Sequence, residues 1–347
     1  MAGLQASGLA SGSPSNFFRA KLDDVRYLVT VLKALAYKDK AQCILSPQGL
    51  RVITEDSQAS QSRGYLEASH FREYNFPDLD RPGDHENDQE AAENSEDQPG
   101  TASSITFGID IQALLDCLTI FGGASAHPST TATGGDPYDF PTQETRAIPI
   151  ETSRVPVRIT RPLTGGVLSL MLEEREVVTV CQLNTTDPEP ISELHSRFIE
   201  SRVVGKVIMK SEWLRDAFSE LDGTSDTLTL IVASVAPYFR LAASGLAGDA
   251  QMDYPKDTDV VESFSCLENT RNNYRYASIA PCLRALAFST KTSIRVNETG
   301  FLSLQFMIPL NEKDVTFVEY LVSPLIRNDN DDQNSNDENE NQNTAGS

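Results

Sequence analysis

The feature that most constrains the fold is a helix-to-strand unit in the segment from Lys210 to Ser234. Ser211 stands where a helix N-cap is expected, and Glu212 follows in the first turn, where a carboxylate suits the positive end of the helix dipole. Apolar residues then recur with the spacing of one helix face, at Leu214, Ala217, Phe218 and Leu221. From Thr227 to Val232, leucine and valine alternate with other residues, which is the period of a strand. The segment therefore predicts a short helix followed by a strand.

Three further segments repeat this unit. Helical patterns run over residues 23–36, 110–122 and 281–290, and strand patterns come after them, over residues 42–56, 155–174 and 292–308. Further strands of the second half are predicted at Tyr238–Ala243, Tyr274–Ile279 and Thr316–Val322. Each unit must bury its helix face against strands, so four copies predict an α+β fold in which strands greatly outnumber short helices.

Composition divides the chain into two domains. Residues 1–15, 77–104, 124–152 and 328–347 are rich in Gly, Ser, Pro, Asn or acidic residues and contain too few apolar groups to offset the entropy of ordering. We therefore expect them to be disordered. The remainder predicts a first domain over residues 16–185, containing the two internal insertions, and a second over residues 197–327. Residues 186–196 carry two prolines and are expected to be the linker.

The acidic balance is confined largely to the segments expected to be disordered. The formal net charge is −21, but the two insertions and the tail account for 17 of these negative charges. A nucleic-acid partner is therefore not excluded, because binding depends on where positive charge is located. The five cysteines are far apart and form no CxxC pair, and most lie in apolar strand or helix patterns. With no signal peptide recognised at residues 1–15, a reducing intracellular compartment is expected. No apolar run approaches the length that spans a membrane, so no membrane partner is expected.

Several strings resemble one known family. They are DCLTIFG (116–122), LRDAFSELD (214–222), PYFRL (237–241), DYPKD (253–257), SIRVNETGFLSLQFMI (293–308) and FVEY (317–320). These residues closely resemble the Rad-one subunits of the nine-one-one DNA-damage checkpoint clamp, a heterotrimeric relative of PCNA. The resemblance extends from about Phe17 to Pro324 and is interrupted by the two insertions.

The resemblance implies a PCNA-like clamp subunit without enzymatic activity, cofactor or metal. Each of its two domains would hold two helix-plus-strand repeats, with helices lining the ring and sheets outside. The implied partners are two other clamp subunits, a clamp loader, double-stranded DNA through the ring, and checkpoint and repair proteins. The implied location is the nucleus.

Two sets of residues would carry this function. Basic residues on or beside the predicted helices are expected to face DNA, because a clamp holds phosphates without reading bases. They are Arg26, Lys33, Lys210, Arg215, Arg284 and Lys291. The strand ending the first domain is expected to supply a subunit interface through Val177, Val178, Thr179, Val180 and Cys181. The alternative is a buried interior strand, since this run is apolar on both faces.

Two other classes of function stay open at this stage. One is a metal-dependent 3′-to-5′ DNA exonuclease, for which Asp253, Asp257 and Asp259 could hold magnesium. Against it, the chain has no phosphate-binding GxxxxGK[ST] loop and no GxSxG elbow, and its four histidines are scattered. The other is a partner-recruiting scaffold, in which Ser335 in the acidic tail would be a phosphorylation site.

Overall fold

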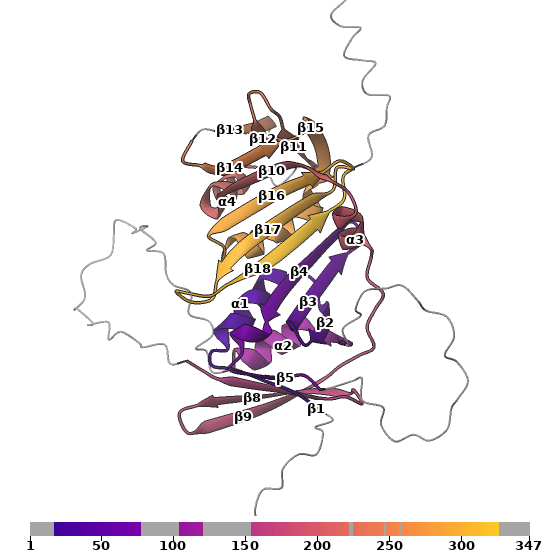
Figure 1. Ribbon diagram of the computed structural model, residues 1–347, viewed down its shortest axis with the longest axis vertical. Coiled ribbons are helices and arrows are strands. Elements are labelled where there is room, and N and C mark those ends of the chain that lie inside the picture. Colours follow the sequence, from indigo (N-terminus) through magenta and orange to yellow (C-terminus); the bar gives the residue numbers. More distant parts are fainter. Residues whose placement is uncertain are drawn as a thin grey trace, which may run out of the picture.

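The computed structural model describes residues 17–77, 104–120, 154–221, 225–245, 248–256 and 258–325. Strands form most of this part and the helices are few and short, as the sequence predicts. Three antiparallel sheets follow one another along the long axis of the molecule (Figure 1). The segments expected to be disordered lie outside the described residues, except for Pro77 and Ser104 at the ends of one insertion.

The first sheet has five strands and lies at one end of the molecule. Its order is β5 (Glu73–Asn75), β1 (Phe17–Leu22), β7 (Val157–Pro162), β8 (Val167–Glu174) and β9 (Val177–Asn184). It joins the start of the chain to a segment more than a hundred residues later, through six register pairs from Phe17↔Pro162 to Leu22↔Val157. β9 pairs with β8 alone and is one edge of this sheet.

The central sheet has nine strands and is built from both halves of the chain. Its order is β14 (Val261–Cys266), β10 (Val203–Lys210), β16 (Lys291–Asn297), β17 (Leu302–Pro309), β18 (Val315–Val322), β4 (Ser60–Glu67), β3 (Gly49–Asp56), β2 (Lys40–Ser46) and β6 (Ile105–Asp110). The halves meet where β18 pairs with β4, from Val318↔Gly64 to Val322↔Ser60. A continuous hydrogen-bonded ladder therefore crosses the boundary between the halves.

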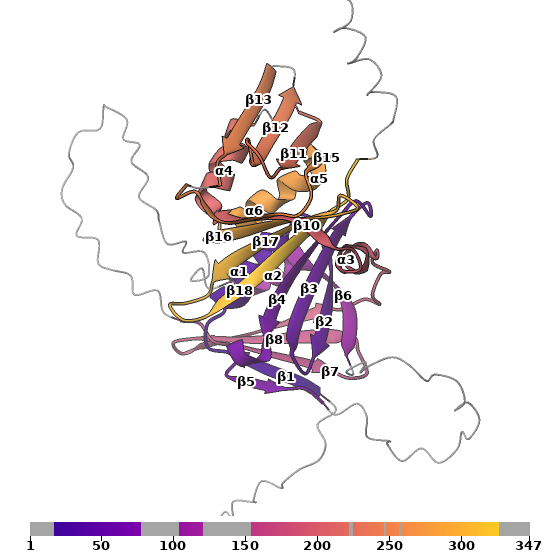
Figure 2. The ribbon, with the colours of Figure 1, turned by 45° about the horizontal axis from the view of Figure 1, so that its top comes forward.

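The third sheet has four strands and lies at the other end (Figures 1 and 2). Its order is β13 (Gly248–Tyr254), β12 (Phe239–Gly245), β11 (Thr227–Val232) and β15 (Thr270–Arg275). β13 pairs with β12 through seven residues and forms one edge. The sequence analysis did not predict β13 or β14. In β13 the apolar residues Ala250, Met252 and Tyr254 do alternate with exposed polar residues, but they are few and only partly buried at a sheet edge.

The helices pack in a row on one face of the central sheet. α1 (Arg26–Leu35) contacts both α2 (Ile111–Leu118) and α6 (Leu283–Leu286), and α6 contacts α4 (Ser211–Glu220). Tyr320 of β18 donates its hydroxyl to the carbonyl oxygen of Ala34 in α1, so its neighbours Phe317 and Glu319 belong to the opposite face. The described residues also contain two shorter helices, α3 (Leu194–Ile199) and α5 (Tyr276–Ile279), and 3₁₀ turns at Ala68–His70 and Ala280–Cys282.

The apolar stripes predicted for the four helices are buried. In α1 the buried residues include Leu28, Leu32 and Leu35, and in α4 they include Leu214 and Phe218. Gly64 lets α1 approach β4 closely, since an added Cβ would lie 2.5 Å from Val31 Cγ1. One prediction of secondary structure is wrong: the strand expected at Tyr274–Ile279 ends at Arg275, and helix α5 begins at Tyr276.

Candidate nucleic-acid interface

Four of the six predicted DNA-facing residues lie on the helix row. Arg26 and Lys33 are half-buried on α1, and Arg215 on α4 and Arg284 on α6 are exposed. Each stands off the buried apolar stripe of its helix, so its charged group reaches the side of the row that faces away from the sheets. The row thus brings together cations from residues 26 to 284 of the sequence.

The other two residues lie on strands. Lys210 ends β10 and Lys291 begins β16, where they are directly opposite each other in the register. Met209 is buried, so alternation along β10 places Lys210 on the sheet face opposite to the helices. The Lys291 ammonium forms an ion pair with Glu262 of β14, with Nζ 2.8 Å from Oε2. Both residues are therefore displaced from the helix row on which the sequence pattern placed them.

Arg26 is held by a buried carboxylate. Asp24 is 3% exposed, and its two oxygens accept from Arg26 Nε at 2.9 Å each and from Nη2 at 2.5 Å. The backbone N–H of Arg26 also donates to Asp24 Oδ1 at 3.0 Å. The hydrogen bond with Asp24 raises the pKa of the Arg26 guanidinium. Its charge is consequently compensated within the protein, unlike that of Lys33.

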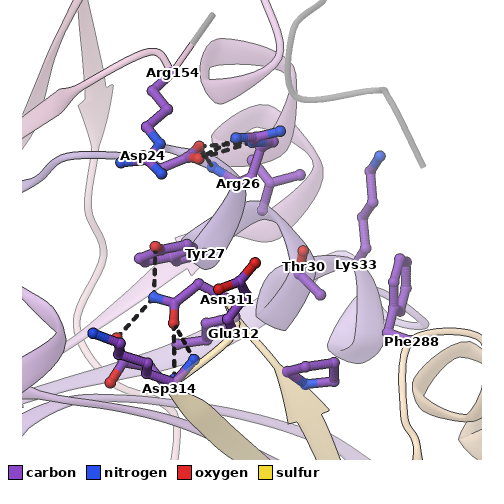
Figure 3. A pocket seen from close by; sticks show the side chains of 14 residues that line it. Asp24, Arg26, Tyr27, Thr30, Lys33, Arg154, Phe288, Asn311, Glu312 and Asp314 are labelled. Carbon is purple, nitrogen blue, oxygen red and sulfur yellow. Dashed lines mark hydrogen bonds and ion pairs between the residues drawn. The ribbon is translucent and has the colours of Figure 1, made fainter. Parts of the chain in front are cut away.

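A cleft of about 660 Å³ opens beside the exposed face of α1. Its other wall is the turn between β17 and β18, residues 310–314, which comes from the far end of the chain. The Asn311 amide donates to the Tyr27 hydroxyl at 2.9 Å and to Asp314 Oδ2 at 2.7 Å, so the turn is tied to the helix (Figure 3). The cleft is lined by both aromatic and charged residues, among them Phe288, Arg154 and Lys313.

The two outer helices of the row are acidic. α4 exposes Glu212, Asp216 and Glu220 against the single cation Arg215. α2 exposes Asp116, whose Oδ1 accepts from the Gln112 amide at 2.8 Å, and it contains no lysine or arginine. Positive charge on the row is therefore concentrated on the two central helices, α1 and α6.

The predicted interface strand β9 is exposed. Val177, Val178 and Val180 are 56%, 54% and 55% exposed, and Thr179 and Cys181 are half-buried. Cys181 packs on the core beneath, where its thiol contacts that of Cys117. The buried-interior alternative does not fit these exposures. The apolar run on β9 instead provides an open, apolar sheet edge.

Of the acidic residues considered for metal binding, Asp253 is engaged in an ion pair with Arg240. Asp253 lies on β13, and its carboxylate accepts hydrogen bonds from Arg240 Nε at 2.5 Å and from Arg240 Nη2 at 2.8 Å. These hydrogen bonds lower the pKa of the Asp253 carboxyl. Asp259 is exposed, and Asp257 and Ser335 lie outside the described residues. Within the described ranges, no group of three His, Cys, Asp or Glu side chains is arranged to hold a metal ion. None of the helices there has the length and hydrophobicity needed to cross a bilayer.

Comparison with known proteins identifies the family. A sequence model described as "Repair protein Rad1/Rec1/Rad17" matches residues 17–308. The mouse "Cell cycle checkpoint protein RAD1" is 36% identical over 305 residues, which cover 88% of this chain and 91% of that protein. The Schizosaccharomyces pombe "DNA damage checkpoint control protein rad1" is 27% identical, with coverage of 89% and 86%. The Mycosarcoma maydis "DNA repair exonuclease REC1" is 22% identical, with coverage of 88% and 90%. The chain therefore belongs to the Rad1/Rec1/Rad17 family of repair proteins.

Proposed function

We propose that this chain is one subunit of a heterotrimeric, ring-shaped checkpoint clamp that is loaded around double-stranded DNA at sites of damage. In this proposal residues 16–185 and 197–327 are two PCNA-like clamp domains, each with two helix-plus-strand repeats, joined by a linker at 186–196. The relatives that are 36% and 27% identical are named as checkpoint proteins, which supports a checkpoint role here.

One observation carries the ring proposal: of the sheet edges, those formed by β9 and β13 lie at opposite ends of the molecule. β9 is an edge of the five-stranded sheet and β13 is an edge of the four-stranded sheet (Figure 1). An unpaired strand edge presents a row of backbone donors and acceptors that a strand of another chain can complete. Two such edges on one subunit suit a closed ring, in which every subunit has two neighbours.

The two edges differ in chemistry, which supports a ring of different subunits. The outward side chains of β9 include Val178 and Val180, whereas the exposed ones of β13 include Asp249 and Asp253. Pairing β9 of one copy with β13 of another would set exposed valines against carboxylates, so each edge favours a different neighbour. The two partners proposed are therefore other PCNA-like clamp subunits.

The helix row supports a DNA-facing role on the inner side of the ring. Lys33 and Arg284 at the centre of the row are proposed to approach phosphates, and this type of contact carries no sequence information. Arg26 and Arg215, also predicted from the sequence, are proposed to contribute less, because Arg26 is engaged by Asp24 and Arg215 lies among the carboxylates of α4. Lys210 and Lys291, also predicted from the sequence, have weaker support because both lie at strand ends. A clamp loader, checkpoint proteins and repair proteins are the further partners, and the nucleus is the proposed location.

The exonuclease alternative has one argument in its favour, the printed name of the Mycosarcoma maydis relative. The engagement of Asp253 by Arg240 argues against it, since this carboxylate is already neutralised by a bidentate partner. We therefore propose a clamp subunit that acts without catalysis, cofactor or metal.

Mass measurement tests the assembly. The purified chain is mixed with two candidate clamp subunits of the same organism, and the complex is analysed by light scattering after size exclusion. A one-to-one-to-one complex is expected, whereas this chain alone is expected to be monomeric. Three copies of this chain assembling without the other subunits would contradict the heterotrimer.

A further inference from the structure

We propose that the cleft between α1 and the β17–β18 turn is a phosphate-binding site for one DNA strand, formed by Lys33, Arg154 and Lys313. This inference rests on the proposed clamp function, and it adds two residues, Arg154 and Lys313, that lie on no helix. It also predicts that the phosphates follow the centre of the helix row and avoid its two ends.

Three segments that are distant in sequence converge on this cleft. Lys33 lies on α1, Arg154 precedes β7, and Lys313 lies in the β17–β18 turn. The neighbour of Arg154, Val155, accepts a hydrogen bond through its carbonyl from the N–H of Val25 at 2.8 Å, directly before α1. The β17–β18 turn is fixed to the same helix through Asn311 and Tyr27. Both outer segments are thus attached to α1 by hydrogen bonds, so the three cations keep their place around one cleft.

None of these three side chains is held in an ion pair by a described residue. Within the described part of the chain, the side-chain nitrogens of Lys33, Arg154 and Lys313 form no ion pair within 4 Å. Arg154 and Lys313 are exposed, and Lys33 is half-buried along its stem. In Figure 3 the Lys33 side chain extends away from the ribbon, whereas the Arg26 guanidinium is joined to Asp24. The three cations are therefore free to take an external anion.

The carboxylates of the cleft are fewer than its cations. The negative charge of Asp24 is balanced by its ion pair with Arg26. The remaining charged residues that line the cleft are three cations, Lys33, Arg154 and Lys313, and two carboxylates, Glu312 and Asp314. Asp314 accepts from the Asn311 amide at 2.7 Å and belongs to the turn itself. The excess is one positive charge in the cleft, and Arg284 on the adjoining helix α6 adds a second. This contrasts with the chain as a whole, whose formal charge is −21.

The surroundings direct a polyanion to this centre. α4 presents three carboxylates against Arg215, and α2 presents Asp116 without a cation. Phosphates approaching either end of the row meet like charge, while those at the α1–α6 centre meet the cations of the cleft. Long, exposed Lys and Arg side chains contact phosphate oxygens without reading bases, as a sliding ring requires. The ligand class is consequently the phosphodiester backbone rather than a base or a small metabolite.

The experiment uses the assembled heterotrimer loaded on closed circular duplex DNA. The double variant Arg154→Ala/Lys313→Ala is compared with the wild type over a salt series, and the slope of log retention against log salt is measured. Two lost phosphate contacts should reduce that slope by roughly 1.8, since each contributes roughly 0.9. The charge-reversed pair Arg154→Glu/Lys313→Glu should reduce retention further. Trimer mass and the thermal melt are measured for every variant.

A matched control pair comes from the opposite face of the central sheet. Arg51→Ala/Lys206→Ala removes one arginine and one lysine that are exposed on strands β3 and β10. The net charge changes equally, yet the slope should stay that of the wild type. Equal flattening by the control pair would overturn the site, because it would show an effect of total charge.

Failure of this inference differs from failure of the clamp proposal. If Arg284→Ala flattens the slope while Arg154→Ala/Lys313→Ala leaves it unchanged in an intact trimer, the cleft proposal is wrong and the clamp proposal stands. If the wild-type trimer is not retained on circular DNA at any salt concentration, both proposals are wrong. We expect the cleft variants and Arg284→Ala to lower the salt slope, and Arg215→Ala to leave the slope near its wild-type value.

Discussion

Arg26 and Lys33 look equivalent on the α1 helix, but we expect them to respond differently to truncation. Arg26→Ala removes the side-chain hydrogen bonds at 2.9, 2.9 and 2.5 Å from the carboxylate of Asp24. Asp24 keeps the backbone N–H of residue 26, at 3.0 Å, but its carboxylate stays in a site that is 3% exposed. A buried, poorly compensated carboxylate destabilises the folded state. The variant should therefore lose stability rather than DNA contacts.

The magnitude follows from the burial of the pair. Removing one partner of a fully buried ion pair costs about 3–5 kcal/mol. The Arg26 side chain is 31% exposed, so water can partly replace it. A loss of about 2 kcal/mol, within the range for hydrogen bonds to charged groups, is the better expectation. At roughly 2–4 °C per kcal/mol for a chain of this size, the melting temperature should fall by roughly 4–8 °C.

The assay is urea and thermal unfolding of the isolated chain, with Lys33→Ala as the matched control. Lys33→Ala should change stability by less than about 0.5 kcal/mol, because no ion pair joins its ammonium to a described residue. The double variant Asp24→Asn/Arg26→Ala should regain part of the loss, since it removes the uncompensated charge. In the DNA retention assay, Lys33→Ala should flatten the salt slope more than Arg26→Ala. Equal stabilities for Arg26→Ala and Lys33→Ala would refute the argument that Asp24 needs this partner.

Three further predictions follow from the structure. Val180→Glu places a charge at a position that is 55% exposed on β9. The trimer should therefore be lost, while the thermal melt of the isolated chain should be unchanged. An intact trimer by light scattering would contradict the interface. Gly64→Ala should destabilise the chain by about 1–3 kcal/mol in urea unfolding, because the new Cβ would lie 2.5 Å from Val31 Cγ1; a neutral result would show that α1 can shift. Burial is the main cause, and the nearby Arg63 the second, of a pKa of His195 below its ordinary value of 6.5. At pH values just below 6.5 the folded state therefore binds fewer protons than the unfolded state. Stability should accordingly fall as the pH drops through this window, and His195→Gln should flatten that dependence in unfolding experiments between pH 7.5 and 5.5; identical pH profiles would exclude His195 as the source.

Local patterns predicted the elements well where one face of each is buried. The apolar spacing at Leu28, Leu32 and Leu35 predicted α1, and alternation predicted β11 and β17, because burial on one side imposes a period on the sequence. Weak or short patterns explain the omissions. In β13 the apolar Ala250 and Met252 alternate with exposed polar residues, but the run is short and its apolar side chains are only partly buried, so the strand period is weak. The strand expected over Tyr274–Ile279 failed for a similar reason, since four residues of α5 are too few to show a helical period.

Position in the tertiary structure decided the rest. The valines of β9 fit a buried strand as well as an edge, and only the order of strands in the five-stranded sheet exposes them. Lys291 lies seven residues after Arg284, as on one helix face, yet it begins β16 opposite Lys210 of β10, and its ammonium forms an ion pair with Glu262 of β14. The sequence by itself predicted the helices and strands that bury one apolar face, and it contains the strings that carry the family resemblance. The meeting of Lys33, Arg154 and Lys313 at one cleft was decided by the fold alone, because periodicity reports only contacts within a few residues, while that meeting depends on hydrogen bonds between segments more than a hundred residues apart.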